Sequence, residues 1–197
     1  STEALLAKLL VNNNAVYSTK MDQRLFIKNR IIHENLNPKI LVIGSSRIMQ
    51  ISNDDLNKQT LNLGVSGASI EDHIAITLMA LEKFNVDTIL LAADPWLLNK
   101  YHNQLRWKSI SEEYKISLKS IQLKSKDYNI IKNKNYREIY FFHERFLEKL
   151  YIFVNIRKLD IEFKANQIDN LTKQVILRDG KRVYANTKTE EKIKAKI

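Results

Sequence analysis

The sequence predicts an α/β domain, a three-layer sandwich in which a mainly parallel central sheet lies between helices. The first observation is an uninterrupted apolar run, Ile40 to Ile43, which is typical of a strand buried on both faces. The second is the order strand, loop, helix, strand across residues 39–100, which defines a βαβ unit whose handedness is almost fixed. We therefore expect the first strand to be central, with helices on either side of the sheet.

Length and composition restrict the class of protein. The 197 residues fit one domain that is large enough to bury a core, and 44% hydrophobic with 27% charged residues excludes general disorder. The net charge of +10 is compatible with nucleic acid, an anionic membrane or wall polymer, or a lysine-rich proteome. No long run of adjacent basic residues favours nucleic acid, so we expect no such partner. The absence of cysteine excludes disulfides and thiolate metal sites, and no run of about 18 apolar residues predicts a membrane span.

We predict a single domain that divides into four regions. These are a helical entry segment (1–38), a βαβ core (39–100), a helical region (101–170), and a strand, turn and tail (171–197).

The entry segment contains two helix candidates, Ala4 to Val11 and Met21 to Ile32. The second has one broad apolar face, which excludes Phe26. That face consists of Met21, Leu25, Ile27, Ile31 and Ile32.

The core region follows in order. After the first strand and its Gly44-Ser45-Ser46-Arg47 turn, we expect a short helix over Ile48 to Leu56, then a brief strand beginning at Leu61. Ser69 and Asp72 resemble a capping box, with Asp in place of the usual Glu or Gln. Apolar residues then recur at helical spacing up to Phe84, and Thr88 to Ala93 is expected to be another buried strand.

The later regions carry weaker signals. We expect helices joined by polar turns in Trp107 to Lys134, and a long helix in Tyr136 to Lys164 that forms an insertion after the third strand. Val175 to Leu177 is the last strand candidate, Asp179-Gly180 marks a turn, and Thr189 to Ile197 is expected to be a helical tail.

Polar or glycine residues follow each of the three predicted strands. Ser46 lies at the carboxyl end of the first, where a nucleophile gains access to solvent and to the amide donors of a helix start. Gly67 would bring a backbone amide near the same point, and Asp94 a polar side chain. Ligands bind at this edge of parallel sheets, so the pattern favours acyl transfer. The alternative is a tight turn or anion cradle in which Ser45 or Ser46 only caps a helix.

These blocks resemble the SGNH, or GDSL-like, hydrolase and acyltransferase superfamily, which shares a flavodoxin-like sheet. Gly44-Ser45-Ser46 is similar to its first block, with serine in place of aspartate, as in the Gly-Ser-Ser-Arg branch that modifies cell-surface polymers. Asn62 to Gly67 is similar to the second block, and Leu91 to Asp94 to the third, with aspartate in place of asparagine.

The resemblance implies roles for these residues. Ser46 would be the nucleophile, and the amides of Ser46 and Gly67 would form the oxyanion hole, with Gly64 as a second possibility for the latter. Because a carboxylate repels an oxyanion, Asp94 is expected to be a structural cap or a positioning group. Independently of the resemblance, the position of Arg47 after the first strand suggests that it holds either an anionic substrate or the edge of the sheet.

The chain departs from the family at its C-terminus, where no Asp-x-x-His occurs. We expect His73 and His143 to be surface or packed residues, and neither His33 nor His102 lies in the expected place. Either the chain ends before the final block, or catalysis has been lost. Leu177 to Tyr184 resembles the hairpin that precedes that block, which favours the first explanation.

Three functions remain open. The first is a serine esterase or O-acyltransferase that acts on an acylated carbohydrate or other polymer of the bacterial envelope, without cofactor or metal. The resemblance implies that it would lie at the periplasmic or extracellular face of a membrane, anchored by a segment upstream of Ser1. The second is a non-catalytic module of the same fold that binds anionic cell-surface polymer. The third is a phosphate-binding domain of the flavodoxin type. Aromatic side chains such as Trp96, Trp107, Phe141 and Phe142 could stack on sugars, but core packing is the default expectation.

Overall fold

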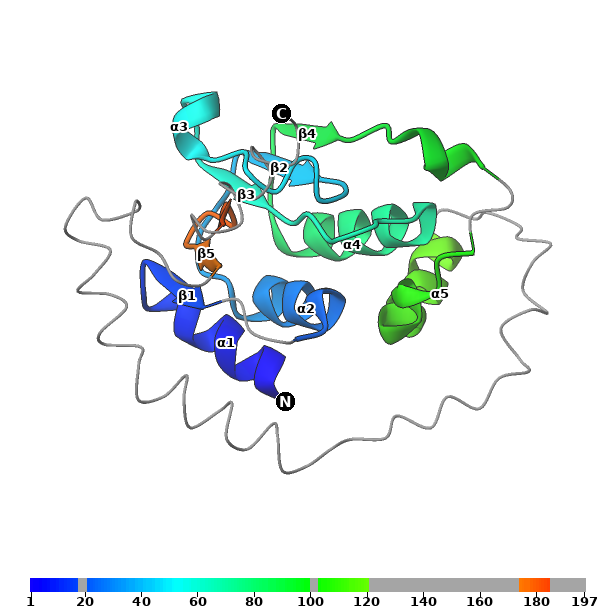
Figure 1. Ribbon diagram of the computed structural model, residues 1–197, viewed down its shortest axis with the longest axis horizontal. Coiled ribbons are helices and arrows are strands. Elements are labelled where there is room, and N and C mark those ends of the chain that lie inside the picture. The colour runs from blue at the N-terminus through cyan, green and yellow to red at the C-terminus, as the bar shows by residue number, and fades with distance from the viewer. Residues whose placement is uncertain (18–20, 100–102, 121–173, 185–197) are drawn as a thin grey trace, which may run out of the picture.

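A computed structural model describes residues 1–17, 21–99, 103–120 and 174–184 of the chain (Figure 1). The strands are β1 (Ala15–Tyr17), β2 (Ile40–Ile43), β3 (Thr60–Asn62), β4 (Thr88–Leu91), β5 (Val175–Leu177) and β6 (Arg182–Val183). The helices are α1 (Thr2–Val11), α2 (Gln23–His33), α3 (Asn53–Leu56), α4 (Ile70–Lys83) and α5 (Ser111–Ser120), with 3-10 helices η1 (Pro95–Leu98) and η2 (Arg106–Ile110). The architecture is α/β: a small parallel sheet in the order β3-β2-β4 flanked by helices, and a small antiparallel sheet in the order β1-β5-β6. The predicted α/β class, the parallel sheet and the central place of the first strand are confirmed.

The parallel sheet brings the ends of its strands to one edge. Ile40 pairs with Thr60 of β3 and with Thr88 of β4, so the three strands run in register. Pairing continues past the strands, because the Val65 amide donates to the Gly44 carbonyl at 2.9 Å and the Ala92 amide donates to the Ile43 carbonyl at 2.9 Å. The segments that follow the three strands therefore lie side by side.

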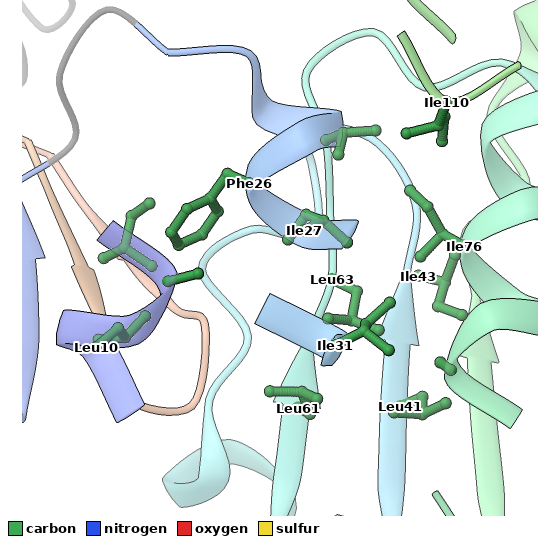
Figure 2. Close-up of a cluster of buried hydrophobic side chains, with 14 of the residues drawn as sticks. Leu10, Phe26, Ile27, Ile31, Leu41, Ile43, Leu61, Leu63, Ile76 and Ile110 are labelled. Atoms are coloured by element: carbon green, nitrogen blue, oxygen red, sulfur yellow. The ribbon is translucent and has the colours of Figure 1, made fainter. Parts of the chain in front are cut away.

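A continuous apolar core joins the helices to one face of this sheet. In Figure 1, α2 and α4 lie on the same side of the sheet, and Figure 2 shows their side chains meeting those of β2 and β3. The labelled members are Leu10, Phe26, Ile27, Ile31, Leu41, Ile43, Leu61, Leu63, Ile76 and Ile110. Burying a side chain of this size contributes about 1.5–3 kcal/mol, so the cluster fixes the helices against the strands.

The antiparallel sheet docks a turn on the edge strand β3. Its central strand β5 pairs with β1 and β6, and the predicted Asp179-Gly180 turn connects β5 to β6. Gly180 has a φ of +92°, and a Cβ there would lie 2.1 Å from the Asn62 carbonyl oxygen. Only glycine fits this approach. Strand β1 was not predicted, because three residues beside a polar break carry no periodic signal.

Two predictions for the core region were wrong. The strand expected over Thr88 to Ala93 is β4, which lies at an edge of the described sheet rather than inside it, and its Leu91 is 55% exposed. An apolar run indicates strand propensity, but the partners that would bury it are set by tertiary structure. The helix expected over Ile48 to Leu56 is only α3, because turns precede it and a capping box of Ser52 and Asp55 starts it late.

The predicted apolar face of α2 is correct for Ile27 and Ile31, which belong to the core, and for Met21 and Leu25, which pack against it. It was wrong at two positions: Phe26, placed outside that face, is 1% exposed and belongs to the core, whereas Ile32 is 53% exposed. The helix also buries two arginines, Arg24 and Arg30, each of which has a hydrogen-bond partner in the interior.

The other local predictions within the described residues are confirmed. They are the helices α1 and α4, the capping box of Ser69 and Asp72, the last strand β5, and helical structure after Trp107. The long helix expected in Tyr136 to Lys164, with Phe141 and Phe142, and the tail from Thr189 lie outside the described residues. Trp107 is buried and contacts Tyr114 edge-on, as expected for a core aromatic. No helix in the described part of the chain is both long and apolar enough to cross a membrane.

Candidate functional site

The candidate site lies at the carboxyl edge of the parallel sheet. Three segments meet there: Gly44–Arg47 after β2, Ser66–Ala68 after β3, and Asp94–Trp96 after β4. We call these three segments the rim. The structure thus brings the predicted residues Ser46, Gly67 and Asp94 to one edge, as the sequence pattern indicated.

Ser45 and Ser46 have opposite environments. Ser45 is fully buried, and its hydroxyl oxygen accepts from the Arg47 amide at 3.4 Å while its carbonyl accepts from Ile48 at 3.2 Å. Ser46 is exposed, and no hydrogen bond within the described residues reaches its hydroxyl or its amide. Ser45 therefore holds the turn, and Ser46 presents its hydroxyl to solvent. No helix starts immediately after Ser46, so any amide donors beside it come from the rim itself.

Two glycines allow the turn to pack closely. A Cβ on Gly44 would lie 2.4 Å from the Ala92 Cβ, and one on Gly64 would lie 2.5 Å from Cδ1 of Ile48. Gly64 is buried, and its amide already donates to Oδ1 of Asn62 at 3.0 Å. That amide is therefore engaged, which leaves Gly67 as the glycine whose amide could serve an oxyanion.

Asn62 ties the segment after Ser46 to strand β3. Its side-chain nitrogen donates to the carbonyls of Ile48 at 2.6 Å and Ile51 at 3.0 Å, and Asn62 itself is 2% exposed. Because every polar atom of this amide is bonded, the turn and the strand move as one unit. The sequence pattern places Asn62 at the start of a block but does not indicate this role.

The carbonyl of Ser66 fixes the direction of the Gly67 amide. Gly67 has a φ of +58°, and the Ser66 carbonyl accepts from Nη2 of Arg24 at 3.2 Å and from Nη1 of Arg106 at 3.4 Å. In a trans peptide the C=O and N–H of one plane point in opposite directions, so the Gly67 N–H points away from both arginines. It has no hydrogen-bond partner within the described residues.

A buried ion pair supports this arrangement. Arg24 donates to both carboxylate oxygens of Asp72, at 2.9 and 2.7 Å, and the two side chains are 3% and 0% exposed. Asp72 also accepts from the Ser69 amide at 2.9 Å, and Gln104 donates to the Gly67 carbonyl at 2.6 Å. Sequence reasoning missed Arg24 and Gln104; Arg24 is one of several basic residues on α2, so the sequence did not single it out.

Asp94 and Arg47 form the third part of the rim. Asp94 is 5% exposed, and its Oδ1 lies 3.7 Å from Nε of Arg47. Its Oδ2 is buried without a hydrogen bond inside the described residues. The Arg47 guanidinium lies 5.0 Å from the ring centroid of Trp96, whose Nε1 donates to the Ala68 carbonyl at 3.0 Å. The Asp94 carboxylate therefore contacts Arg47 from the buried side of the rim.

None of the three rim segments contains a histidine that could act as a base for Ser46. His73, on α4, is 3% exposed, and neither ring nitrogen has a partner among the described residues. Burial lowers the pKa of His73, and the carboxylates of Asp72 and Asp94 offset only part of this effect. His33 lies at the last position of α2, and His102 and His143 lie outside the described residues.

Comparison of the chain with protein families, with curated proteins and with solved structures finds no match. The chemical interpretation therefore depends on the rim itself. It offers an exposed hydroxyl, a main-chain amide of fixed direction, and a guanidinium on a stacked indole. A hydroxyl and an amide of this kind are the parts that an acyl-transfer site needs besides its base.

Proposed function

We propose that the protein is an SGNH-like serine esterase or O-acyltransferase that acts on a carbohydrate of the bacterial envelope. The observation that carries the proposal is the Ser46 hydroxyl, which is exposed and unbonded within the described residues at the end of the central strand. Its neighbour across the rim is the loop whose Gly67 amide has a fixed direction.

The sheet order supports the finer fold assignment that this proposal includes. In β3-β2-β4 the first core strand is central and the next two flank it in parallel. This order fits a flavodoxin-like sheet of the SGNH type, and the three blocks after the strands fit that family's first three blocks. An enzyme of this kind that modifies envelope polymer would be held at the periplasmic or exterior face of a membrane.

The proposed reaction begins with attack of Ser46 Oγ on the acyl carbonyl. A base takes the hydroxyl proton as the new C–O bond forms, and the amides of Ser46 and Gly67 stabilise the negative oxygen. The bond to the leaving alkoxide then breaks, and the base returns its proton to that oxygen. Water or an acceptor hydroxyl releases the acyl group by the same steps. We propose that the base is a histidine from outside the described residues.

The test is hydrolysis of p-nitrophenyl acetate by the full-length protein. Ser46→Ala should lower kcat/KM by about a hundredfold or more, because a nucleophile cannot be replaced by binding alone. Ser120→Ala, at the end of α5, is the matched control and should leave the rate unchanged. Equal rates for Ser46→Ala and the unmodified protein would remove Ser46 from the mechanism.

A further inference from the structure

The Arg47 side chain contacts Asp94 and Trp96 on one side and is exposed to solvent on the other. Its Nε faces Asp94, and its plane lies over Trp96, yet the side chain remains 64% exposed. The indole is fixed in turn by its bond to the Ala68 carbonyl. A guanidinium held in this way loses little freedom when it binds an anion, and its outer N–H groups form a planar fork.

Asp94 does not use the hydrogen-bond donors of Arg47. The 3.7 Å separation is longer than a hydrogen bond, so this contact leaves the donors of the guanidinium available. Asp94 is buried, and its contact with the Arg47 guanidinium offsets part of the cost of burying the carboxylate charge. The pair therefore anchors Arg47 without covering it.

A second arginine, Arg106 of η2, lies beside the Ser66–Ala68 segment of the rim, where its Nη1 donates to the Ser66 carbonyl. Arg106 is exposed, and its Nη1 lies 3.5 Å from the position that a Cβ on Gly67 would occupy. The carboxylate nearest that loop, Asp72, is fully buried and paired with Arg24. One exposed guanidinium thus adjoins Ser46 and another adjoins Gly67, while the acids that contact these segments are buried.

We propose that Arg47 and Arg106 form an anion subsite that binds a carboxylate or phosphate of the carbohydrate beside its scissile acyl ester. The proposal rests on the proposed function, and it specifies the substrate as an acidic polymer. Carboxylate and phosphate share the geometry that a guanidinium recognises in a bidentate manner, so both are admitted. The nearness of the arginines to Ser46 and Gly67 makes the subsite part of the same site.

Binding can be measured apart from turnover, by calorimetry on the full-length Ser46→Ala protein. The probes are an oligogalacturonate, a short poly(glycerol phosphate) and a neutral maltohexaose. We expect one or both acidic probes to bind and the neutral probe not to bind, with affinity falling as salt is raised. Binding of the uronate alone assigns a carboxylate, and binding of the phosphate polymer alone assigns a phosphate.

Matched variants separate the subsite from general attraction to a basic protein. Arg47→Gln and Arg106→Gln should each weaken acidic binding by about tenfold, the effect of losing a charge-assisted hydrogen bond. Lys58→Gln removes the same charge just before β3, at the opposite edge of the sheet, and should change nothing. Arg47→Lys should bind with intermediate affinity, because it keeps the charge but loses the fork. Melting temperatures check that each variant is folded.

The outcomes distinguish the subsite from the reaction. Equal loss in Lys58→Gln, equal binding of maltohexaose, or no binding of either acidic probe would overturn the subsite. Loss of binding in Arg47→Gln together with an unchanged esterase rate in Ser46→Ala supports the subsite while the proposed reaction fails.

Discussion

Removal of the Arg24 guanidinium tests the most buried electrostatic contact of the rim. Arg24→Met leaves the Asp72 carboxylate at 0% exposure without its two strongest hydrogen bonds. Breaking a buried pair from one side costs about 3–5 kcal/mol, because the remaining charge is uncompensated. In a domain of this size each kcal/mol lowers Tm by about 2–4 °C, so the expected decrease is about 6–20 °C.

Urea unfolding of the unmodified and variant proteins measures this cost. The midpoint should fall while the slope stays constant, since the variant changes stability and not the surface exposed on unfolding. Lys39→Met is the matched control: its ion pair with Asp87 is exposed on both sides and is worth at most about 1 kcal/mol. A double variant that also carries Asp72→Leu should recover part of the loss. A cost below about 1 kcal/mol for Arg24→Met would refute the reasoning, because it would mean that Asp72 finds water or another cation without Arg24.

Three further variants test the packing and the titration at and behind the rim. Gly180→Ala should destabilise by more than about 2 kcal/mol, since it combines a φ of +92° with a Cβ 2.1 Å from the Asn62 carbonyl oxygen. Gly67→Ala, with a φ of +58° and no atom nearer than 3.5 Å, should cost only about 1 kcal/mol in the same urea titration. His73 has a lowered pKa in the folded protein, caused first by burial, so the unfolded chain binds the proton more readily. The stability that neutral His73 provides is complete above pH 6.5 and is lost as pH falls below it, with a slope of up to about 1.4 kcal/mol per pH unit. His73→Gln should flatten this slope in unfolding curves recorded between pH 5 and 7, and an unchanged slope would contradict the assignment.

The fold was predictable where its determinants are local. The apolar run of β2, the capping box that starts α4 and the Asp179-Gly180 turn each lie within a few residues of sequence. The exposure of β4, the burial of Phe26 and the exposure of Ile32 on α2 were not predictable in this way. They depend on partners far along the chain, as the pairing of Arg24 with Asp72 shows.

In the candidate site, too, some features could be predicted from the sequence and others could not. The positions of Ser46, Gly67 and Asp94 at one edge follow from the strand order, which alternating strands and helices indicate. The direction of the Gly67 amide does not, since it is set by side chains of Arg24, Gln104 and Arg106 that lie 37 to 43 residues away. These contacts orient individual peptide planes, and the orientation of a peptide plane cannot be inferred from a pattern of residue types.

The role of the Arg24–Asp72 pair follows from what a buried ion pair can and cannot do. Desolvation offsets most of its attraction, so apolar residues of similar size would stabilise the core as well or better. What apolar residues cannot do is hold two successive carbonyls: Arg24 also donates to the Ser66 and Gly67 oxygens, at 3.2 and 3.3 Å. The pair therefore contributes orientation more than stability. In the Arg24→Met, Asp72→Leu double variant, the free energy of unfolding should recover further than the esterase rate, because the Ser66 carbonyl then keeps only the Arg106 guanidinium and the Gly67 amide is held less firmly.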